Sequence, residues 1–396
     1  MRILYICGDH GIPAFGRKGA STHMREIIAG FRKHGHEVML AAADTGGDRR
    51  PDEKDLQAVR LPAPRSRLLG FDGRYLLASW RARSVLRRAV QSFRPDALYE
   101  RFALYFTAGD WLARRTGLPR ILEVNALLSE EQRNRLHYPQ WALRTELNVI
   151  RRAEAIASIS RHMIEVLASH GVDPAKARPF SMAVNPERFL PAPDPMKRRA
   201  ELGWNGNEMV LGYVGSMNVY HQADWFMDLA EKMLRRGEEA VRFLVVGGSA
   251  NKVERHRGRL VRWAEQGRVH FTGSVPQAEL GEWISAMDAV LIPGASPQST
   301  PTKIFESAAI GKPIILPATE PIREICGDDA PYLFPPHDFS AFEGRVREFL
   351  AKPERFQEPA RKLHQRVLND YTWDRHAREL AEWLRALQKK RNGRKA

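Results

Sequence analysis

The sequence predicts an α/β protein made of two consecutive Rossmann-like domains. Short apolar strands alternate with amphipathic helices along most of the chain, which is typical of doubly wound parallel sheets. The alternation is interrupted by a passage with five prolines between residues 179 and 195, and then begins again. With 396 residues the chain is too long for one compact core, so two domains of similar size are the natural division.

The individual elements follow from apolar periodicity and from the turns between them. In the first half we expect strands at residues 2–8, 36–43, 97–102, 120–126 and 155–160, and helices at 20–34 and 161–170. In the second half we expect strands at 209–215, 242–248, 269–273, 289–294 and 313–317, and helices at 222–236, 279–287 and 301–311. A last amphipathic helix is expected from about residue 373 to residue 389.

These elements divide the chain into four parts. We expect a first domain at residues 1–180, a linker at 181–205, a second domain at 206–372, and a C-terminal helix with a basic tail at 373–396. Ligands bind at the carboxyl ends of strands in open α/β sheets. The two sheets are therefore expected to face a shared central cleft.

Composition excludes several classes of protein. No apolar run approaches the roughly eighteen residues that cross a bilayer, and the N-terminal strand is too short for a secretory signal. Cys7 and Cys326 are far apart and form no redox or metal motif, so we expect a reduced, cytoplasmic protein. No D-x-D, H-E-x-x-H, C-x-x-C or G-x-S-x-G pattern occurs, and the sequence predicts neither a metal site nor a cofactor.

The net charge of +15 indicates an anionic partner. Residues 1–190 carry 31 lysines and arginines against 20 acidic residues, and residues 65–88 hold seven arginines with one acid, interleaved with leucines and aromatic residues. Such a basic amphipathic segment is typical of docking on an anionic membrane. Arg81, Arg83, Arg87 and Arg88 are the candidate membrane or acceptor surface; the alternative is a solvated helix face.

A phosphate-binding helix start is predicted near residue 302. Pro301, Thr302 and Lys303 open a helix whose first N–H groups, dipole and lysine suit a phosphate. Glu306 lies one turn further on, where a carboxylate can accept hydrogen bonds from a ribose. The segment is therefore expected to hold a nucleotide diphosphate.

Two glycine turns occupy corresponding places after the first strand of each domain. Gly16, Lys18, Gly19, Ala20 and Ser21 lead into the first helix and are candidates for binding a phosphate or a sugar hydroxyl. Their spacing matches neither the dinucleotide fingerprint nor the P-loop, and an ordinary loop before a helix cap is the alternative.

The second turn contains Gly215 and Ser216. Three histidines stand beside these loops and are candidates for the active site by position. They are His10, His23 and His221.

Five motifs in order resemble the glycosyltransferases of family four, which have the GT-B fold. They are KGASTHMREIIAGFRKHGHEV (18–38), SMAVNPERFLP (181–191), YVGSMNVYHQADWFMDLAEKM (213–233), VHFTGSVPQAELGEWISAMDAVLIP (269–293) and TPTKIFESAAIGKPII (300–315). The resemblance covers nearly the whole chain. It implies that the C-terminal helix returns to the first domain, and that Gly215, Ser216, Thr302, Lys303, Ile304 and Glu306 bind a nucleotide-sugar donor.

The chain departs from the family pattern at several places. Many members carry an arginine and a lysine after the first strand of the donor domain, where this chain has Ser216 or Met217 and His221. Gln298 stands where the first of two glutamates is common. Asn125 lies near the place of a histidine that contacts the donor sugar in many members.

The resemblance, read with these departures, makes Lys303, Asn125 and His221 the catalytic candidates, and Gln298 a donor-binding candidate. Glu100 and Arg101, at the end of the third strand, are further candidates for the cleft.

The resemblance implies a retaining, metal-independent transfer of a sugar from a nucleotide-diphosphate donor to an acceptor hydroxyl. The basic segment favours a lipid-linked acceptor in polysaccharide or lipopolysaccharide synthesis, with the protein peripheral at the inner face of the membrane. The alternatives are decoration of a soluble small molecule, a GT-B nucleotide-sugar epimerase, and a catalytically silent subunit. The sequence lacks the dinucleotide fingerprint of a nicotinamide-dependent dehydrogenase, and it contains no recognisable module for reading nucleic acid.

Overall fold

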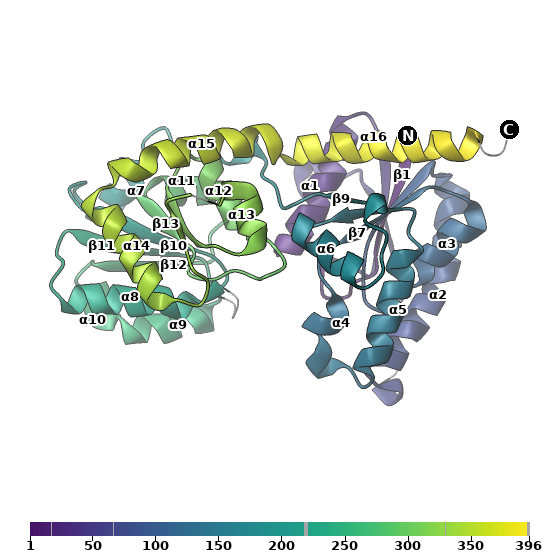
Figure 1. Ribbon diagram of the computed structural model, residues 1–396, viewed down its shortest axis with the longest axis horizontal. Coiled ribbons are helices and arrows are strands. Elements are labelled where there is room, and N and C mark those ends of the chain that lie inside the picture. Colours follow the sequence, from purple (N-terminus) through teal and green to yellow (C-terminus); the bar gives the residue numbers. More distant parts are fainter. Residues whose placement is uncertain (17, 66, 218–220, 329, 394–396) are drawn as a thin grey trace. The chain divides into compact units, whose positions relative to one another are not determined.

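The computed structural model describes residues 1–16, 18–65, 67–217, 221–328 and 330–393, which form two compact units (Figure 1). The first unit combines Met1–Ser181 with Trp373–Ala396, and the second is Met182–Thr372. The chain therefore passes between the units twice. The first unit is assembled from both ends of the sequence.

A seven-stranded parallel sheet forms the centre of the first unit. Its order is β5-β3-β1-β6-β7-β8-β9, so the direction of winding reverses between β1 and β6. The strands are β1 (Arg2–Cys7), β3 (Glu37–Ala42), β5 (Gln57–Arg60), β6 (Ala97–Arg101), β7 (Arg120–Val124), β8 (Ala155–Ser158) and β9 (Ala177–Pro179). The inner strands are buried on both faces, as their continuous apolar runs require.

Helices cover both faces of this sheet. They are α1 (Gly19–Lys33), α2 (Gly70–Phe93), α3 (Ala108–Thr116), α4 (Leu128–Glu131), α5 (Pro139–Arg151), α6 (Arg161–Ser169) and the C-terminal α16 (Trp373–Gly393). A two-stranded ribbon, β2 (Pro13–Phe15) with β4 (Asp44–Gly47), and 3-10 turns at Pro51–Glu53, Arg67–Leu69, Arg133–Arg135 and Pro174–Lys176 complete the unit.

The C-terminal helix α16 packs on α1 in the first unit, as the family resemblance implies. The two helices approach closely at Gly30, where a Cβ atom would lie 2.4 Å from the Cβ of Ala377. Trp373, Leu380 and Leu384 of α16 are buried in this contact region.

The second unit has a six-stranded parallel sheet in the order β12-β11-β10-β13-β14-β15. Its strands are β10 (Met209–Val214), β11 (Val241–Val246), β12 (Val269–Gly273), β13 (Ala289–Leu291), β14 (Ile314–Pro317) and β15 (Leu333–Phe334). Its helices are α7 (Met196–Glu201), α8 (Ala223–Arg235), α9 (Ala250–Arg259), α10 (Val261–Glu265), α11 (Leu280–Ser285), α12 (Thr302–Ala309), α13 (Glu320–Cys326), α14 (Phe339–Ala351) and α15 (Glu354–Asp370). Among the residues that the structure describes in this unit, 3-10 turns lie at Pro186–Arg188 and Gln277–Glu279.

The stretch expected as a linker, 181–205, is not a free connection. From Met182 onward it belongs to the second unit and contains α7. Val184, Phe189 and Trp204 are buried in the apolar core of that unit. Its prolines mark turns correctly, but the apolar residues between them contribute to the core.

Candidate functional site

The second unit brings its predicted site residues to the point where its strand order reverses. The order changes direction between β10 and β13, so the loops that follow these two strands diverge at the carboxyl edge of the sheet. Gly215 and Ser216 directly follow β10, and the loop after β13 leads to Thr302, the first residue of α12. Residues 218–220 of the first loop lie outside the described part of the chain.

Helix α12 presents Lys303 and Glu306 together. The Lys303 ammonium lies 2.7 Å from Oε2 of Glu306, and the glutamate is 7% exposed. The two groups predicted for the diphosphate and the ribose therefore form an ion pair with each other. The charge of Lys303 is partly balanced before any ligand arrives.

The other predicted residues of this loop and helix have local roles. Ile304 is fully buried, and its N–H donates to the carbonyl oxygen of Pro301, so its side chain faces the core. The N–H of Gln298 donates to Oγ of Ser296 at 3.2 Å, four residues before α12 begins. Thr300 donates from Oγ1 to the carbonyl oxygen of Pro321, which ties this loop to α13.

His221 lies beside the turn after β10. A Cβ atom at Gly215 would be 3.3 Å from Nδ1 of this imidazole. Burial, together with the positive charges of Lys303 and Lys252, lowers the pKa of His221 to about 4. At neutral pH the imidazole is therefore uncharged.

Lys252 was not predicted from the sequence. It lies in the first turn of α9, and its Nζ donates to the carbonyl oxygens of Met217 at 2.8 Å and Ser216 at 3.3 Å. The signal in the sequence is local: a lysine four residues after Gly248, the second glycine of the pair that follows β11. Only the packing of two loops shows that this lysine reaches the turn after β10.

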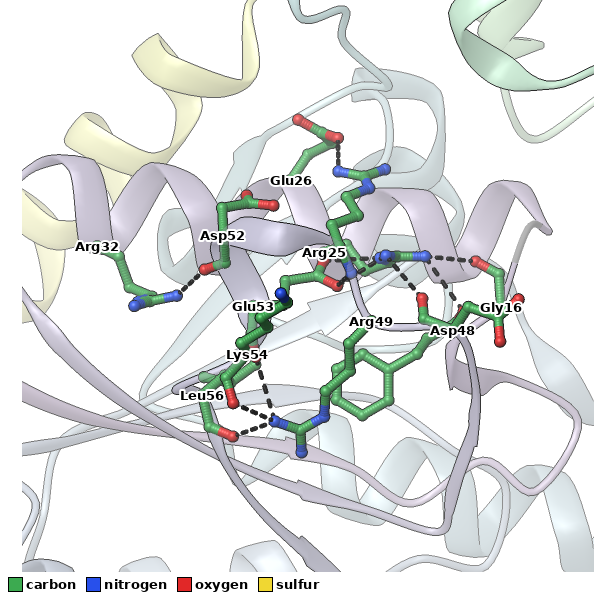
Figure 2. A network of polar contacts seen from close by, with 12 residues as sticks. Gly16, Arg25, Glu26, Arg32, Asp48, Arg49, Asp52, Glu53, Lys54 and Leu56 are labelled. Carbon is green, nitrogen blue, oxygen red and sulfur yellow. Dashed lines mark hydrogen bonds and ion pairs between the residues drawn. The ribbon is translucent and has the colours of Figure 1, made fainter.

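In the first unit the glycine loop is held by a buried arginine (Figure 2). The Arg25 guanidinium donates to both carboxylate oxygens of Glu53 at 2.7 Å. It also donates to the carbonyl oxygens of Phe15, Gly16 and Asp48. The loop that contains Gly16 is therefore tied to the segment before β5.

The remaining residues of the predicted glycine loop start α1. Nζ of Lys18 donates to the carbonyl oxygen of Gly11 at 2.9 Å and closes the loop on itself. Gly19 has open space where a Cβ atom would be, and Ala20 follows it in the first turn of the helix. Ser21 is fully buried, so its hydroxyl is not presented at the surface.

Asn125, at the end of β7, belongs to a buried polar network around Glu123. Oε1 of Glu123 accepts from Nδ2 of Asn125 at 2.5 Å and from Arg101, and Oε2 accepts from the hydroxyls of Tyr99 and Tyr5. His23 lies 3.6 Å from the same carboxylate. Because Asn125 donates its amide nitrogen to Glu123, its carbonyl oxygen remains to accept a further hydrogen bond.

Glu100 has a structural position. It is fully buried and lies 2.6 Å from Nη1 of the equally buried Arg120, in the interior between the sheet and α3. Burial raises its pKa. Of the two candidates at the end of β6, only Arg101 joins the network around Glu123.

The basic surface of the first unit is a hollow along α2 with a volume of about 800 Å³. Trp80 and Trp111 line it, and so do six arginines: Arg60, Arg65, Arg81, Arg83, Arg87 and Arg88. Arg83 stacks over Trp111 at 5.5 Å from the ring centroid. Ser66 and the Arg67 side chain lie outside the described part of the chain.

Comparison with known proteins identifies the family. A model described as Glycosyltransferase Family 4 matches residues 17–188, and one described as Glycosyl transferases group 1 matches residues 208–352. The chain is a family-four glycosyltransferase. The first match covers most of the first unit of this glycosyltransferase and the second covers most of the second unit, and its fold is GT-B.

The relatives are distant. A D-inositol 3-phosphate glycosyltransferase from Gordonia bronchialis is 24% identical over 308 residues, which are 74% of this chain but only 66% of that relative. Sucrose-phosphate synthase from Thermosynechococcus elongatus has the same fold, with a TM-score of 0.77, 18% identity and 98% of each chain covered. Anabaena HepE, solved with UDP and glucose, gives a TM-score of 0.74 at 16% identity over 98% of this chain and all of its own.

In the described ranges of this family-four glycosyltransferase, no helix has both the length and the apolar character that crossing a membrane requires.

Proposed function

We propose that this protein is a retaining glycosyltransferase that moves a sugar from a nucleotide-diphosphate donor to an acceptor hydroxyl. The observation that carries the proposal is the arrangement at the switch point of the second sheet. There the start of α12, with Lys303 and Glu306, lies within electrostatic reach of His221 and the turn after β10. The family of the chain supports the same reaction class.

The chemistry requires stabilisation of a leaving diphosphate. Breaking the anomeric carbon–oxygen bond places negative charge on that group, and fixed cationic and N–H donors stabilise it in the transition state. Lys303, the first N–H groups of α12 and the Gly215–Ser216 turn are the donors we assign to this role. Glu306 then releases Lys303 to the diphosphate and accepts hydrogen bonds from the ribose.

Retention of anomeric configuration is part of the proposal. A double displacement needs a carboxylate nucleophile beside the sugar, and Glu123, near Asn125 in the first unit, is committed to a buried network of donors. We therefore favour departure and attack on the same face, with the leaving phosphate taking the proton of the acceptor. Asn125 would bind the donor sugar through its carbonyl oxygen. Positive side chains would balance the diphosphate without a metal.

The test is incubation with a panel of nucleotide sugars, in which release of nucleoside diphosphate and product mass are measured. Lys303→Ala and Glu306→Ala should each reduce release at least about tenfold, the effect of losing one charge-assisted contact. Arg361→Ala, which removes only an exposed pair with Glu358, is the matched control. Full activity in both site variants would refute this site. Loss of activity in EDTA would refute the metal-independent form of the proposal.

We propose that the acceptor is lipid-linked and that the enzyme works from the cytoplasm at the inner face of an anionic membrane, in polysaccharide or lipopolysaccharide synthesis. The arginine hollow supports a polyanionic partner. An apolar cluster at the amino ends of α2 and α5 supports a membrane in particular. It consists of Leu68, Leu69, Tyr138 and Trp141, which are 99%, 48%, 67% and 44% exposed.

The two helix ends lie together because Oδ2 of Asp72 in α2 accepts from the N–H groups of His137 and Tyr138, both at 3.1 Å. An exposed apolar cluster that is continuous with an arginine-rich helix fits the boundary between headgroups and acyl chains. Flotation with anionic liposomes tests this surface. Charge reversal at Arg81, Arg83, Arg87 and Arg88 should abolish flotation, whereas reversal at Arg235 and Arg255 of the second unit should leave it unchanged.

A soluble acceptor is the second candidate. The Gordonia relative is named for D-inositol 3-phosphate, and the same arginine hollow suits a small phosphorylated compound. Transfer to a soluble acceptor without liposome binding would establish it. Interconversion of a nucleotide sugar in the absence of any acceptor would establish the epimerase instead.

A further inference from the structure

Two neighbouring loops of the second unit pack directly against each other. The turn after β11 contains Gly247 and Gly248, both with positive φ, of +109° and +87°. A Cβ atom at Gly247 would lie 2.4 Å from the carbonyl oxygen of Gly215, in the turn after β10. A Cβ atom at Gly248 would lie 2.8 Å from Sδ of Met217. Because these glycines have no side chains, the start of α9 can approach the turn after β10.

Because the two loops lie so close, the ammonium of Lys252 contacts the turn after β10. It is the third residue of α9 (Ala250–Arg259), and its Nζ donates to the carbonyl oxygens of Met217 at 2.8 Å and Ser216 at 3.3 Å. Met217 has a φ of +53°, which orients its peptide differently from an extended strand. The lysine is thereby held at the carboxyl edge of the sheet, beside β10.

In the described part of the chain, no carboxylate balances the charge of Lys252. Within the residues that the structure describes, no carboxylate oxygen lies within 4.0 Å of its Nζ, and its two partners are neutral carbonyl groups. Lys303, by contrast, is paired with Glu306 at 2.7 Å. The positive charges of both lysines contribute to lowering the pKa of His221.

We propose that Lys252 binds the diphosphate of the donor from α9, and that it supplies the positive charge that the turn after β10 lacks. This inference rests on the proposed function. Ser216, Met217 and His221 bring no charge of their own at neutral pH, whereas an ammonium with two N–H groups on backbone oxygens keeps a third for a phosphate oxygen. Strand β11 and helix α9, through Lys252, therefore supply positive charge to the diphosphate site that the turn after β10 does not.

Calorimetric binding of UDP, GDP and ADP, each with its nucleoside, tests the assignment. Lys252→Met keeps the length of the side chain and removes the charge. We expect it to weaken diphosphate binding about 10- to 100-fold, the effect of one charge-assisted contact, and to leave nucleoside binding unchanged. Lys252→Arg should restore most of the affinity. Arg255→Met is the matched control, because this exposed residue of the same helix pairs with Asp224.

Each outcome decides a different question. Unchanged diphosphate affinity in Lys252→Met would overturn the inference while the proposed function stands. Equal weakening of diphosphate and nucleoside would show that Lys252 only shapes the turn, which also overturns it. Failure of the wild-type protein to bind any diphosphate would refute the proposed function itself.

Discussion

Arg25 illustrates how a single buried charge determines a loop in the first unit. Its guanidinium is 7% exposed and has five acceptors: two carboxylate oxygens of Glu53 and three carbonyl oxygens. Removing one partner of a buried pair leaves the other charge desolvated and unpaired, which costs about 3–5 kcal/mol. The glycine loop at Gly16 therefore depends on a buried ion pair with the segment before β5.

Arg25→Met should accordingly lower the free energy of unfolding by about 3–5 kcal/mol, measured by denaturant titration. The control is Arg32→Met in the same helix, since Arg32 forms an exposed pair with Asp55. Exposed pairs contribute roughly 0–1 kcal/mol. Equal stability of the two variants would show that the Arg25 network is not a stabilising feature.

The first unit also buries two histidines beside the same tryptophan. His23 and His376 are 3% and 5% exposed, and both contact Trp373. Burial lowers the pKa of His23 to about 4 and that of His376 to about 3. In the unfolded chain both titrate near 6.5. Between about pH 6.5 and 4 the unfolded state therefore binds more protons than the folded state.

Stability should consequently fall as the pH decreases from about 6.5 towards 4, because proton uptake favours the unfolded chain in that window. Denaturant titration across this range measures the effect. His376→Gln should reduce the slope of stability against pH. An unchanged slope in His376→Gln would contradict the assignment.

At the scale of elements, the contact between α1 and α16 depends on the absence of a side chain at Gly30. A methyl group there would lie 2.4 Å from the Cβ of Ala377 and 3.2 Å from the carbonyl oxygen of Trp373. Neither atom belongs to a flexible side chain, so the helices themselves would have to separate. Overpacking of this kind typically costs about 1–3 kcal/mol.

Gly30→Ala should therefore destabilise the protein by about 1–3 kcal/mol in thermal or denaturant unfolding. Gly344→Ala in α14 should instead stabilise the protein. A Cβ atom at Gly344 meets no atom within 4 Å, and alanine is the better helix former by roughly 1 kcal/mol. Stabilisation by both substitutions would show that α1 and α16 can separate without cost.

At the scale of the whole molecule, the first unit is discontinuous in sequence. Its helix α16 is connected through the second unit, and it buries Trp373, Ala377, Leu380, Ala381 and Leu384. Each large buried apolar side chain contributes about 1.5–3 kcal/mol. Three such side chains approach the total stability of a typical domain. The residues that we assign to the diphosphate and the ribose of the donor, in contrast, lie in the continuous stretch Met182–Thr372.

Deletion of residues 373–396 should therefore lower the stability of the first unit and leave the stability of the second unit unchanged. Hydrogen exchange should increase in α1 and the strands of the first unit and stay unchanged in β10–β15. Binding of nucleoside diphosphate should persist, whereas sugar transfer should be lost. Loss of diphosphate binding together with transfer would show that the second unit does not form its site independently.

Much of the secondary structure was predictable because its signals are local. Every expected strand is present, since apolar runs bounded by glycine and proline depend only on neighbouring residues. The short strands β2, β4, β5, β9 and β15 were not predicted. They have two to four residues each, and β5 and β9 carry mostly exposed or half-exposed side chains at their edge of the sheet. Such segments become strands only when a neighbouring strand offers its hydrogen bonds.

The amino-acid sequence by itself determined the α/β class, the two Rossmann-like units and the helix that begins with Thr302, because each depends on periodicity or on turn residues within a few positions. Only the tertiary structure decided that Lys252 reaches the turn after β10, that Arg25 ties the loop at Gly16 to Glu53, and that Tyr5 reaches Glu123. These contacts join side chains to loops and strands whose proximity depends on packing. The charge around a site is a sum over spatial neighbours, and spatial neighbours are a property of the fold.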